Sequence, residues 1–139
     1  MKRSASAVWK GGLKDGNGTI STDSGVLSDT QYSFTTRFEQ GTGTNPEELI
    51  AAAHAGCFAM ALSNELAQAG LTPESIRTTA TVTLETSALA ITAVHLNVSA
   101  KVPGADQQAF EAAANSAKSG CPVSKVLNAQ ITMEARLEG

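Results

Sequence analysis

The sequence predicts an α+β fold built around an antiparallel sheet. Two observations carry this prediction. Strand-like alternation of apolar and polar residues lies on both sides of residues 45–69, which themselves form one long apolar helical segment. Strands and helices also show little of the regular alternation that marks a parallel sheet. The chain of 139 residues has no internal repeat or long linker, so we expect a single domain, residues 1–139.

The first forty residues are expected to form strands. Glycine-containing turn signals at residues 16–18 and 23–25 flank a short segment that fits a strand. Residues 32–38 (YSFTTRF) alternate, with the aromatic side chains on one face. On this pattern Arg37 leaves the sheet on the face opposite the aromatic residues.

A helix is predicted to begin at residue 46. Asn45 suits the N-cap, Pro46 the first helical position and Glu48 the third. The helical pattern runs to Ala69, and Gly70 is placed to end it. The middle of this helix is apolar nearly all round, which indicates burial on most sides. Because a small domain rarely covers such a helix alone, we expect a second subunit to help bury it.

The remaining residues are expected to form a hairpin, two helices and a final strand. His95 falls on the polar face of the second hairpin strand, where we expect it to be exposed. The expected segments are the strands 76–85 and 92–102, the helices 106–118 and 122–127, and the strand 131–137.

Composition excludes several classes of partner. The net charge of −3 and the scarcity of aromatic residues argue against nucleic acid. Residues 1–10 lack the apolar core of a secretory signal, and the longest apolar run, about 14 residues, is shorter than the roughly 20 that span a bilayer. We therefore expect no membrane association and a cytoplasmic location. Two cysteines also fall short of a structural zinc site, so no metal is expected.

The two cysteines, Cys57 and Cys121, are the main candidates for chemistry. Each alone fits either an inert core residue or a reactive thiol. Cys121 precedes Pro122 and so occupies an N-cap-like position, where helix N–H groups favour a thiolate. Cys57 lies within the apolar helix. It would gain the same advantage only if the helix broke near residues 53–56, where small residues gather.

Charged residues near the cysteines widen the set of candidates. Arg37 could stabilise a thiolate, and Glu47 could hold its guanidinium, since Glu48 is needed at the helix start. For both residues a solvated surface charge is the alternative. Ten residues of straight helix rise about 15 Å, so Glu47 reaches Cys57 only through a kink or through Arg37. His54 fits a base, a metal ligand with the cysteines, or a hydrogen-bonded helix histidine.

Two motifs carry a family resemblance. Residues 45–62 (NPEELIAAAHAGCFAMAL) and 120–124 (GCPVS) resemble the two cysteine motifs of the OsmC/Ohr family of thiol peroxidases. Residues 24–27, 32–38 and 43–46 are similar to the OsmC (osmotically inducible protein C) branch. The similarity extends over nearly the whole chain, with its motifs in family order.

The resemblance implies roles for four residues. Cys57 would be the peroxidatic thiol and Cys121 the resolving thiol, while Arg37 would activate Cys57 and Glu47 would orient Arg37. No catalytic role for His54 follows from it. The resemblance also implies an OsmC-like fold, with the sheet wrapped around a long central helix, and an intertwined homodimer with active sites at the subunit interface.

The expected activity is thiol-dependent reduction of organic hydroperoxides and hydrogen peroxide, in defence against oxidative or osmotic stress. A Cys57–Cys121 disulfide would form and an external dithiol would reduce it; the family suggests a lipoyl protein. No metal, flavin or haem is needed. The alternative is a dimeric stress or binding protein without enzymatic activity, whose thiols pack or bind metal.

Overall fold

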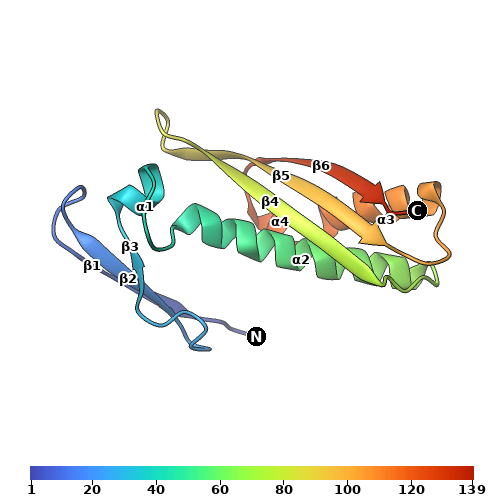
Figure 1. Cartoon of the computed structure of the whole chain (residues 1–139), viewed down its shortest axis with the longest axis horizontal. Coiled ribbons are helices and arrows are strands. Elements are labelled where there is room, and N and C mark those ends of the chain that lie inside the picture. The colour runs from blue at the N-terminus through green and yellow to red at the C-terminus, as the bar shows by residue number, and fades with distance from the viewer. The chain divides into compact units, whose positions relative to one another are not determined.

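The computed structural model describes all residues, 1–139, and forms two compact units, Met1–Leu49 and Ile50–Gly139 (Figure 1). The first unit contains a three-stranded sheet in the order β1-β2-β3. Both neighbouring pairs are antiparallel, as the turn-separated sequence pattern predicts. The strands are β1 (Ala5–Lys10), β2 (Asn17–Thr22) and β3 (Thr30–Tyr32).

The strand expected over residues 32–38 is wrong, because β3 ends at Tyr32 and a short helix, α1 (Phe34–Phe38), follows. Ser33 begins this helix with a capping box. Its hydroxyl accepts from the Thr36 amide at 3.3 Å, and the Thr36 hydroxyl accepts from the Ser33 amide at 2.8 Å. Phe34 and Phe38 are four positions apart, so a helix also places them together, with ring centroids 4.8 Å apart.

The long helix α2 (Pro46–Gln68) begins at the predicted residue and ends one residue before the predicted Ala69. The Asn45 side chain accepts from the Glu48 amide at 2.8 Å and so caps the first turn. At the other end Gly70 has a φ of +79°, and the Leu71 amide donates to the Leu66 carbonyl at 2.9 Å. This is the left-handed glycine termination that closes many helices.

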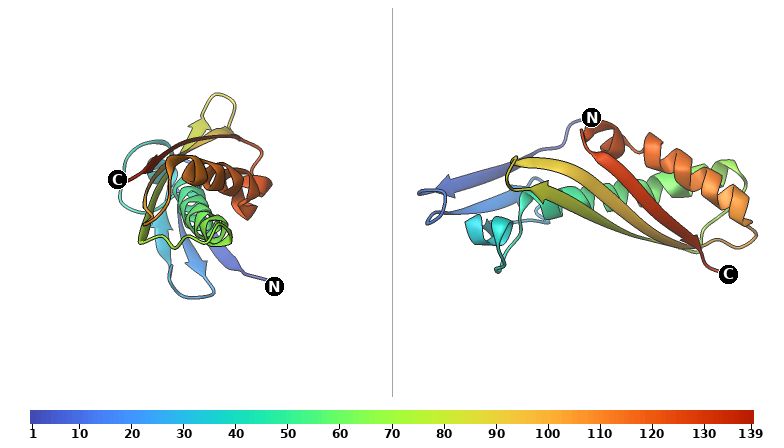
Figure 2. Two further views of the ribbon diagram at one scale, coloured as in Figure 1. Left: turned by 90° about the vertical axis from the view of Figure 1, so that its right-hand side faces the viewer. Right: turned by 90° about the horizontal axis from the view of Figure 1, so that it is seen from above.

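The second unit contains a three-stranded sheet in the order β4-β5-β6, with helices on one face (Figures 1 and 2). The β4–β5 hairpin is antiparallel as predicted. The β5–β6 pair is parallel, contrary to the expectation of a purely antiparallel sheet. The unit's other elements are β4 (Ser75–Glu85), β5 (Ala90–Lys101), α3 (Gln107–Gly120), α4 (Pro122–Val126) and β6 (Gln130–Leu137).

The core of the second unit lies between α2, α3 and β5. Its apolar side chains are fully or almost fully buried, and they are Phe58, Leu62, Leu66, Val94, Leu96, Val98, Ala100, Val102, Phe110, Ala113, Ala114 and Ala117. At roughly 1.5–3 kcal/mol for each large side chain buried, this cluster is the main source of stability for the unit. His95 is exposed, as predicted, and forms a hydrogen bond with Thr132.

Within one chain, α2 is buried along a single stripe and not on most sides. The buried residues recur at every fourth position, namely His54, Phe58, Leu62 and Leu66. Other apolar residues of the helix stay uncovered, and Met60 is 77% exposed. By length and apolar content α2 could cross a membrane. Its buried stripe packs into the core of the second unit, and 22% of its most apolar window is buried within the chain.

Candidate active site

Cys57 and Cys121 lie side by side although 64 positions separate them in the sequence. Their sulfur atoms are 2.8 Å apart, with the Cys121 thiol donating to the Cys57 sulfur, and no disulfide joins them. A disulfide bond is about 2.05 Å long, so a small movement would close one. Cys121 is completely buried, whereas Cys57 is partly exposed. The pair therefore has one sulfur that solvent can reach and one that it cannot.

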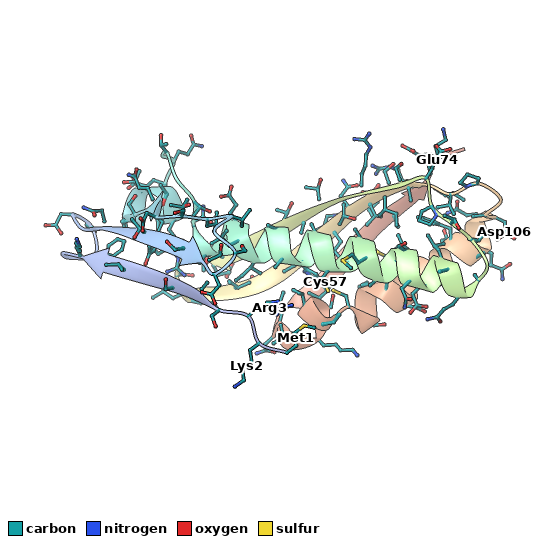
Figure 3. All side chains as sticks on the ribbon, turned by 90° about the horizontal axis from the view of Figure 1, so that it is seen from below. Met1, Lys2, Arg3, Cys57, Glu74 and Asp106 are labelled. Atoms are coloured by element: carbon teal, nitrogen blue, oxygen red, sulfur yellow. The ribbon has the colours of Figure 1, made fainter.

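Cys57 lies midway along α2, where Figure 3 labels it. The helix is continuous from Pro46 to Gln68, so the break considered near residues 53–56 is absent. Ala and Gly at these positions are compatible with a helix, since the buried stripe on either side of them holds it in place. Cys57 therefore has no helix N-terminus of its own.

Cys121 lies at the corner between α3 and α4, as the Gly-Cys-Pro sequence predicts. Its amide donates to the Ala117 carbonyl at 3.0 Å and ends α3, and its carbonyl accepts from the Lys125 amide at 3.1 Å at the start of α4. Pro122 occupies the first turn of α4. The Cys121 sulfur forms no side-chain cap of regular geometry, although the Val123 and Ser124 amides lie near enough to act on it, and it faces Cys57.

The surroundings shift the pKa values of the two thiols in opposite directions. Burial raises the pKa of Cys57, and the neighbouring Cys121 raises it further, while the Val123 amide acts to lower it. Burial also acts to raise the pKa of Cys121, but the Cys57 thiol, the Ser124 and Val123 amides and the Ser124 hydroxyl together lower it. No cation is among the groups that set the Cys57 pKa.

Arg37 and Glu47 form a second pair, in the first unit. The guanidinium Nε donates to Oε1 at 3.0 Å, and Nη2 donates to Oε2 at 3.1 Å, in a bidentate arrangement. The Arg37 side chain is 40% exposed and that of Glu47 is 11% exposed. Arg37 comes from α1 and not from a strand.

Glu47, rather than its neighbour Glu48, is the partner of Arg37, as the sequence predicts. The Glu48 carboxylate accepts from the Thr44 hydroxyl at 2.8 Å, and its amide takes part in capping α2. Asn45 also donates from its side chain to the Thr36 carbonyl at 2.9 Å, which ties α1 to the start of α2. The hydrogen bonds of Thr44 and Asn45 therefore hold in place the segments that carry Arg37 and Glu47.

His54 is fully buried and lies next to a residue that sequence reasoning missed. Its Nε2 is 2.7 Å from the Ser124 hydroxyl oxygen. Burial lowers the pKa of His54, so the ring is neutral at pH 7. The contact fits the hydrogen-bonded helix histidine, and no local signal in the sequence indicates Ser124 as its partner. No group of three potential ligands that could hold a metal ion occurs in the structure.

Each unit has a cavity beside one of these pairs. In the second unit a cavity of about 350 Å³ adjoins Cys57, Met60, Asn64, Glu65 and Pro122. In the first unit a cavity of about 240 Å³ is lined by Arg37 and by aromatic residues, which are Trp9, Tyr32, Phe34 and Phe38. One cavity therefore offers access to a thiol, and the other combines a cation with an apolar wall.

Comparisons with known proteins agree on one family. The family described as OsmC-like protein matches residues 39–136, a range that takes in nearly all of the second unit and residues 39–49 of the first. The chain is 51% identical over 140 aligned residues to Peroxiredoxin OsmC of Escherichia coli, covering 99% of this chain and 98% of that protein. The peroxiredoxin of the same name from Shigella flexneri matches to the same extent.

Solved structures of low sequence identity share the fold. An OsmC-like protein of unknown function from Vibrio cholerae has a TM-score of 0.76 at 20% identity, with 98% of this chain and 99% of that chain covered. The organic hydroperoxide resistance protein OhrB of Bacillus subtilis has a TM-score of 0.65 at 24% identity, with 96% and 98% covered. The α+β class and the resemblance drawn from the two cysteine motifs are thereby confirmed. The chain belongs to the OsmC-like protein family and, as the whole-length match to peroxiredoxins indicates, is a peroxidase.

Proposed function

We propose that the chain reduces organic hydroperoxides, and hydrogen peroxide, with Cys57 as the peroxidatic thiol and Cys121 as the resolving thiol. The observation that carries the proposal is the 2.8 Å contact between a partly exposed sulfur and a fully buried one. A peroxide arriving from solvent meets Cys57 first. Cys121 is buried behind Cys57, where peroxide does not reach it but where it is close enough to attack an oxidised Cys57.

The chemistry takes two steps. The Cys57 thiolate attacks the distal oxygen of ROOH; an S–O bond forms, the O–O bond breaks, and the leaving alkoxide takes a proton to give ROH. Cys121 then attacks the Cys57 sulfenic acid, so that an S–S bond forms, the S–O bond breaks and water leaves. Sulfur loses two electrons and the peroxide gains them. No metal, flavin or haem takes part.

The first step needs a Cys57 thiolate, which the second unit alone does not favour because the Cys57 pKa is raised there. We assign the missing positive charge to Arg37, from the same chain or from a partner subunit, with Glu47 as the residue that orients it. The bidentate hydrogen bonds support this assignment, since they fix the guanidinium plane and leave Nη1 without a bond to Glu47.

The aromatic cavity beside Arg37 supports organic hydroperoxides as substrates. Its walls suit an alkyl or aryl group, while the guanidinium suits the peroxide oxygens. Hydrogen peroxide, which has no alkyl or aryl group, would contact only the guanidinium. The organic compounds should therefore bind more tightly than hydrogen peroxide.

The uncovered apolar face of α2 supports a homodimer. The helix buries one stripe within its own chain, and Met60, one turn after Cys57, is exposed. A second copy of the chain would cover this face and exclude water from the thiol. In the cytoplasm, where stable disulfides are rare, the Cys57–Cys121 disulfide would be transient and would need an external dithiol, for which a lipoyl protein is a candidate.

Mass spectrometry after a single turnover tests the two-cysteine mechanism. The reduced protein is mixed with one equivalent of cumene hydroperoxide and the remaining thiols are alkylated. Wild-type protein should lose two mass units and both alkylation sites. Cys57→Ser should consume no peroxide, whereas Cys121→Ser should consume one equivalent and hold Cys57 as sulfenic acid. Sustained turnover by Cys57→Ser would overturn the assignment.

A further inference from the structure

His54 is a buried polar group that the two-step mechanism leaves without a role. Its exposed fraction is zero, its Nε2 lies 2.7 Å from the Ser124 hydroxyl, and its Nδ1 has no hydrogen-bond partner. Buried polar atoms nearly always find a partner, so an orphaned ring nitrogen in the core calls for an explanation. A phenyl ring would fill the same space without this penalty.

Ser124 connects His54 to the thiol pair. Counting from Cys121 as the N-cap of α4, Ser124 is the third helical residue and so lies about one turn further along the helix. The Ser124 hydroxyl is accordingly among the groups that stabilise a thiolate at Cys121. Two partly buried hydrogen bonds, His54–Ser124 and Cys121–Cys57, thus meet at the first turn of α4, where Ser124 follows Cys121 by three residues.

The unpaired Nδ1 of His54 determines which atoms are the donors in these hydrogen bonds. If Nδ1 carried the hydrogen of the neutral ring, a buried N–H donor would have no acceptor. With the hydrogen on Nε2, the unpaired atom is an acceptor, which native structures tolerate more often. His54 then donates to the Ser124 oxygen, and the Ser124 hydrogen is free to point at the Cys121 sulfur. Because the ring is neutral, it acts through hydrogen bonds and not through charge.

We propose that His54 is a positioning residue for the resolving step, which acts through Ser124 to hold the Cys121 sulfur ready for attack on the Cys57 sulfenic acid. The inference rests on the two-cysteine mechanism proposed above. In the resting pair the two sulfur atoms share a hydrogen bond, across which the Cys121 hydrogen can face Cys57. Once Cys57 carries oxygen, that hydrogen leaves with the hydroxyl as water, and the Ser124 donor stabilises the negative charge that develops on Cys121.

The proposal predicts different effects of substitutions at Ser124 and His54 on the two chemical steps. Removing the Ser124 hydroxyl or the His54 donor should leave the first oxidation of Cys57 unchanged. It should slow disulfide formation about threefold for each unit by which the pKa of the attacking thiol rises, because the thiolate fraction falls about tenfold while its nucleophilicity rises about threefold. The sulfenic acid of Cys57 should persist longer as a result.

Rapid-quench experiments on the full-length reduced protein measure both steps. After one equivalent of cumene hydroperoxide, dimedone traps the sulfenic acid and an alkylating agent traps free thiols at each time point. Ser124→Ala and His54→Leu are the test variants. Ser124→Thr, which keeps the hydroxyl, and His54→Gln, which keeps a donor near the Nε2 position, should restore fast disulfide formation.

Matched controls come from the same chain. Ser119 lies two residues before Cys121, but its hydroxyl donates to the Asn115 and Ser116 carbonyls. His95 is exposed on β5. Ser119→Ala and His95→Leu should behave as wild type in both steps. In a Cys57→Ser background, ultraviolet titration should show a higher pKa for Cys121 in Ser124→Ala than in the protein that keeps Ser124. The substitution changes no charged side chain, so the two titrations can be compared directly.

The outcomes distinguish this inference from the mechanism on which it rests. If wild-type protein forms no disulfide, the two-cysteine mechanism fails and the inference fails with it. If wild-type protein forms the disulfide and Ser124→Ala forms it equally fast, only the inference is overturned. Equal slowing of both steps would also overturn it. Ser124→Ala removes one partly buried hydroxyl, so the test does not depend on whether His54→Leu folds.

Discussion

Arg37 and Glu47 form a bidentate pair, in which one edge of the guanidinium donates to both carboxylate oxygens at 3.0 and 3.1 Å. A lysine cannot reproduce this arrangement, because an ammonium group is a point charge without a plane. We predict that Arg37→Lys slows the oxidation of Cys57 by cumene hydroperoxide about tenfold, a change of about 1.4 kcal/mol in the barrier. Arg37→Ala should slow it further. Stopped-flow measurement of peroxide consumption in a single turnover gives the rates.

Glu47→Gln tests the orienting role separately, since it keeps one acceptor oxygen and removes the charge. It should slow the same step by less than Arg37→Ala does. Arg77→Lys is the matched control, because Arg77 is an exposed arginine on β4. If Arg37→Lys and Arg77→Lys both behave as wild type, the bidentate pair has no part in the oxidation step.

Protein stability should depend on pH through His54. Its pKa is lowered in the folded chain by burial, whereas in the unfolded chain it lies near 6.5. At pH values between the two, the unfolded state binds more protons, so the free energy of unfolding falls as the pH drops below about 6.5. The slope from this one group can reach about 1.4 kcal/mol per pH unit. Above pH 6.5 its contribution is constant.

Urea unfolding of wild-type and His54→Leu proteins at several pH values checks this prediction. The variant should lose most of the slope between pH 6.5 and pH 5, while His95→Leu, which changes an exposed histidine, should keep it. An unchanged slope in His54→Leu would mean that other groups cause the acid sensitivity.

Phe58 is the core residue adjacent to the peroxidatic thiol. It is fully buried, and truncation would leave a cavity between α2 and the sheet. Phe58→Ala should lower the free energy of unfolding by about 3–5 kcal/mol. Leu13→Ala, at an exposed position, should lower it by about 0.5 kcal/mol or less. Thermal or denaturant unfolding measures both, and equal losses would contradict the described core.

Met60 tests the proposed homodimer. A lysine in its place would put a charge on the uncovered apolar face of α2 and should weaken self-association by at least about tenfold. Leu89→Lys is the control, because Leu89 is 74% exposed in the β4–β5 turn and Met60 is 77% exposed. Sedimentation equilibrium distinguishes the two variants. If Met60→Lys associates as strongly as wild type, this face of α2 is not the interface.

Local chemistry made parts of the fold predictable from the sequence. Asn45 and Gly70 specify the two ends of α2 through a side-chain acceptor and a left-handed backbone, and both act within a few residues. The strand prediction failed at residues 34–38 because phenylalanines four positions apart are compatible with both a strand and a helix. The Ser33 capping box favours the helix. The parallel β5–β6 pairing agrees with the helical crossover of α3 and α4 that joins the two strands, and the expectation of an antiparallel sheet did not take this connection into account.

The site was predictable to a similar degree. The choice of Glu47 over Glu48 followed from the helix start, where Glu48 was already engaged. The approach of Cys57 to Cys121 could not follow from spacing, since contacts 64 residues apart depend on the whole core; family resemblance supplied it. Ser124 escaped notice because a serine in a short helix is ordinary until a buried histidine is found beside it.

The unequal exposure of the two sulfurs also determines how an oxidised molecule would be regenerated. A reducing dithiol would reach only Cys57, so it would form the mixed disulfide there and expel Cys121. A thiol of low pKa is the better leaving group in such an exchange, and the surroundings of Cys121 lower its pKa. Cys121, at the corner between α3 and α4, would therefore act twice in each cycle. It would first attack Cys57 to form the disulfide, and it would then be the leaving thiol when the dithiol reduces that disulfide.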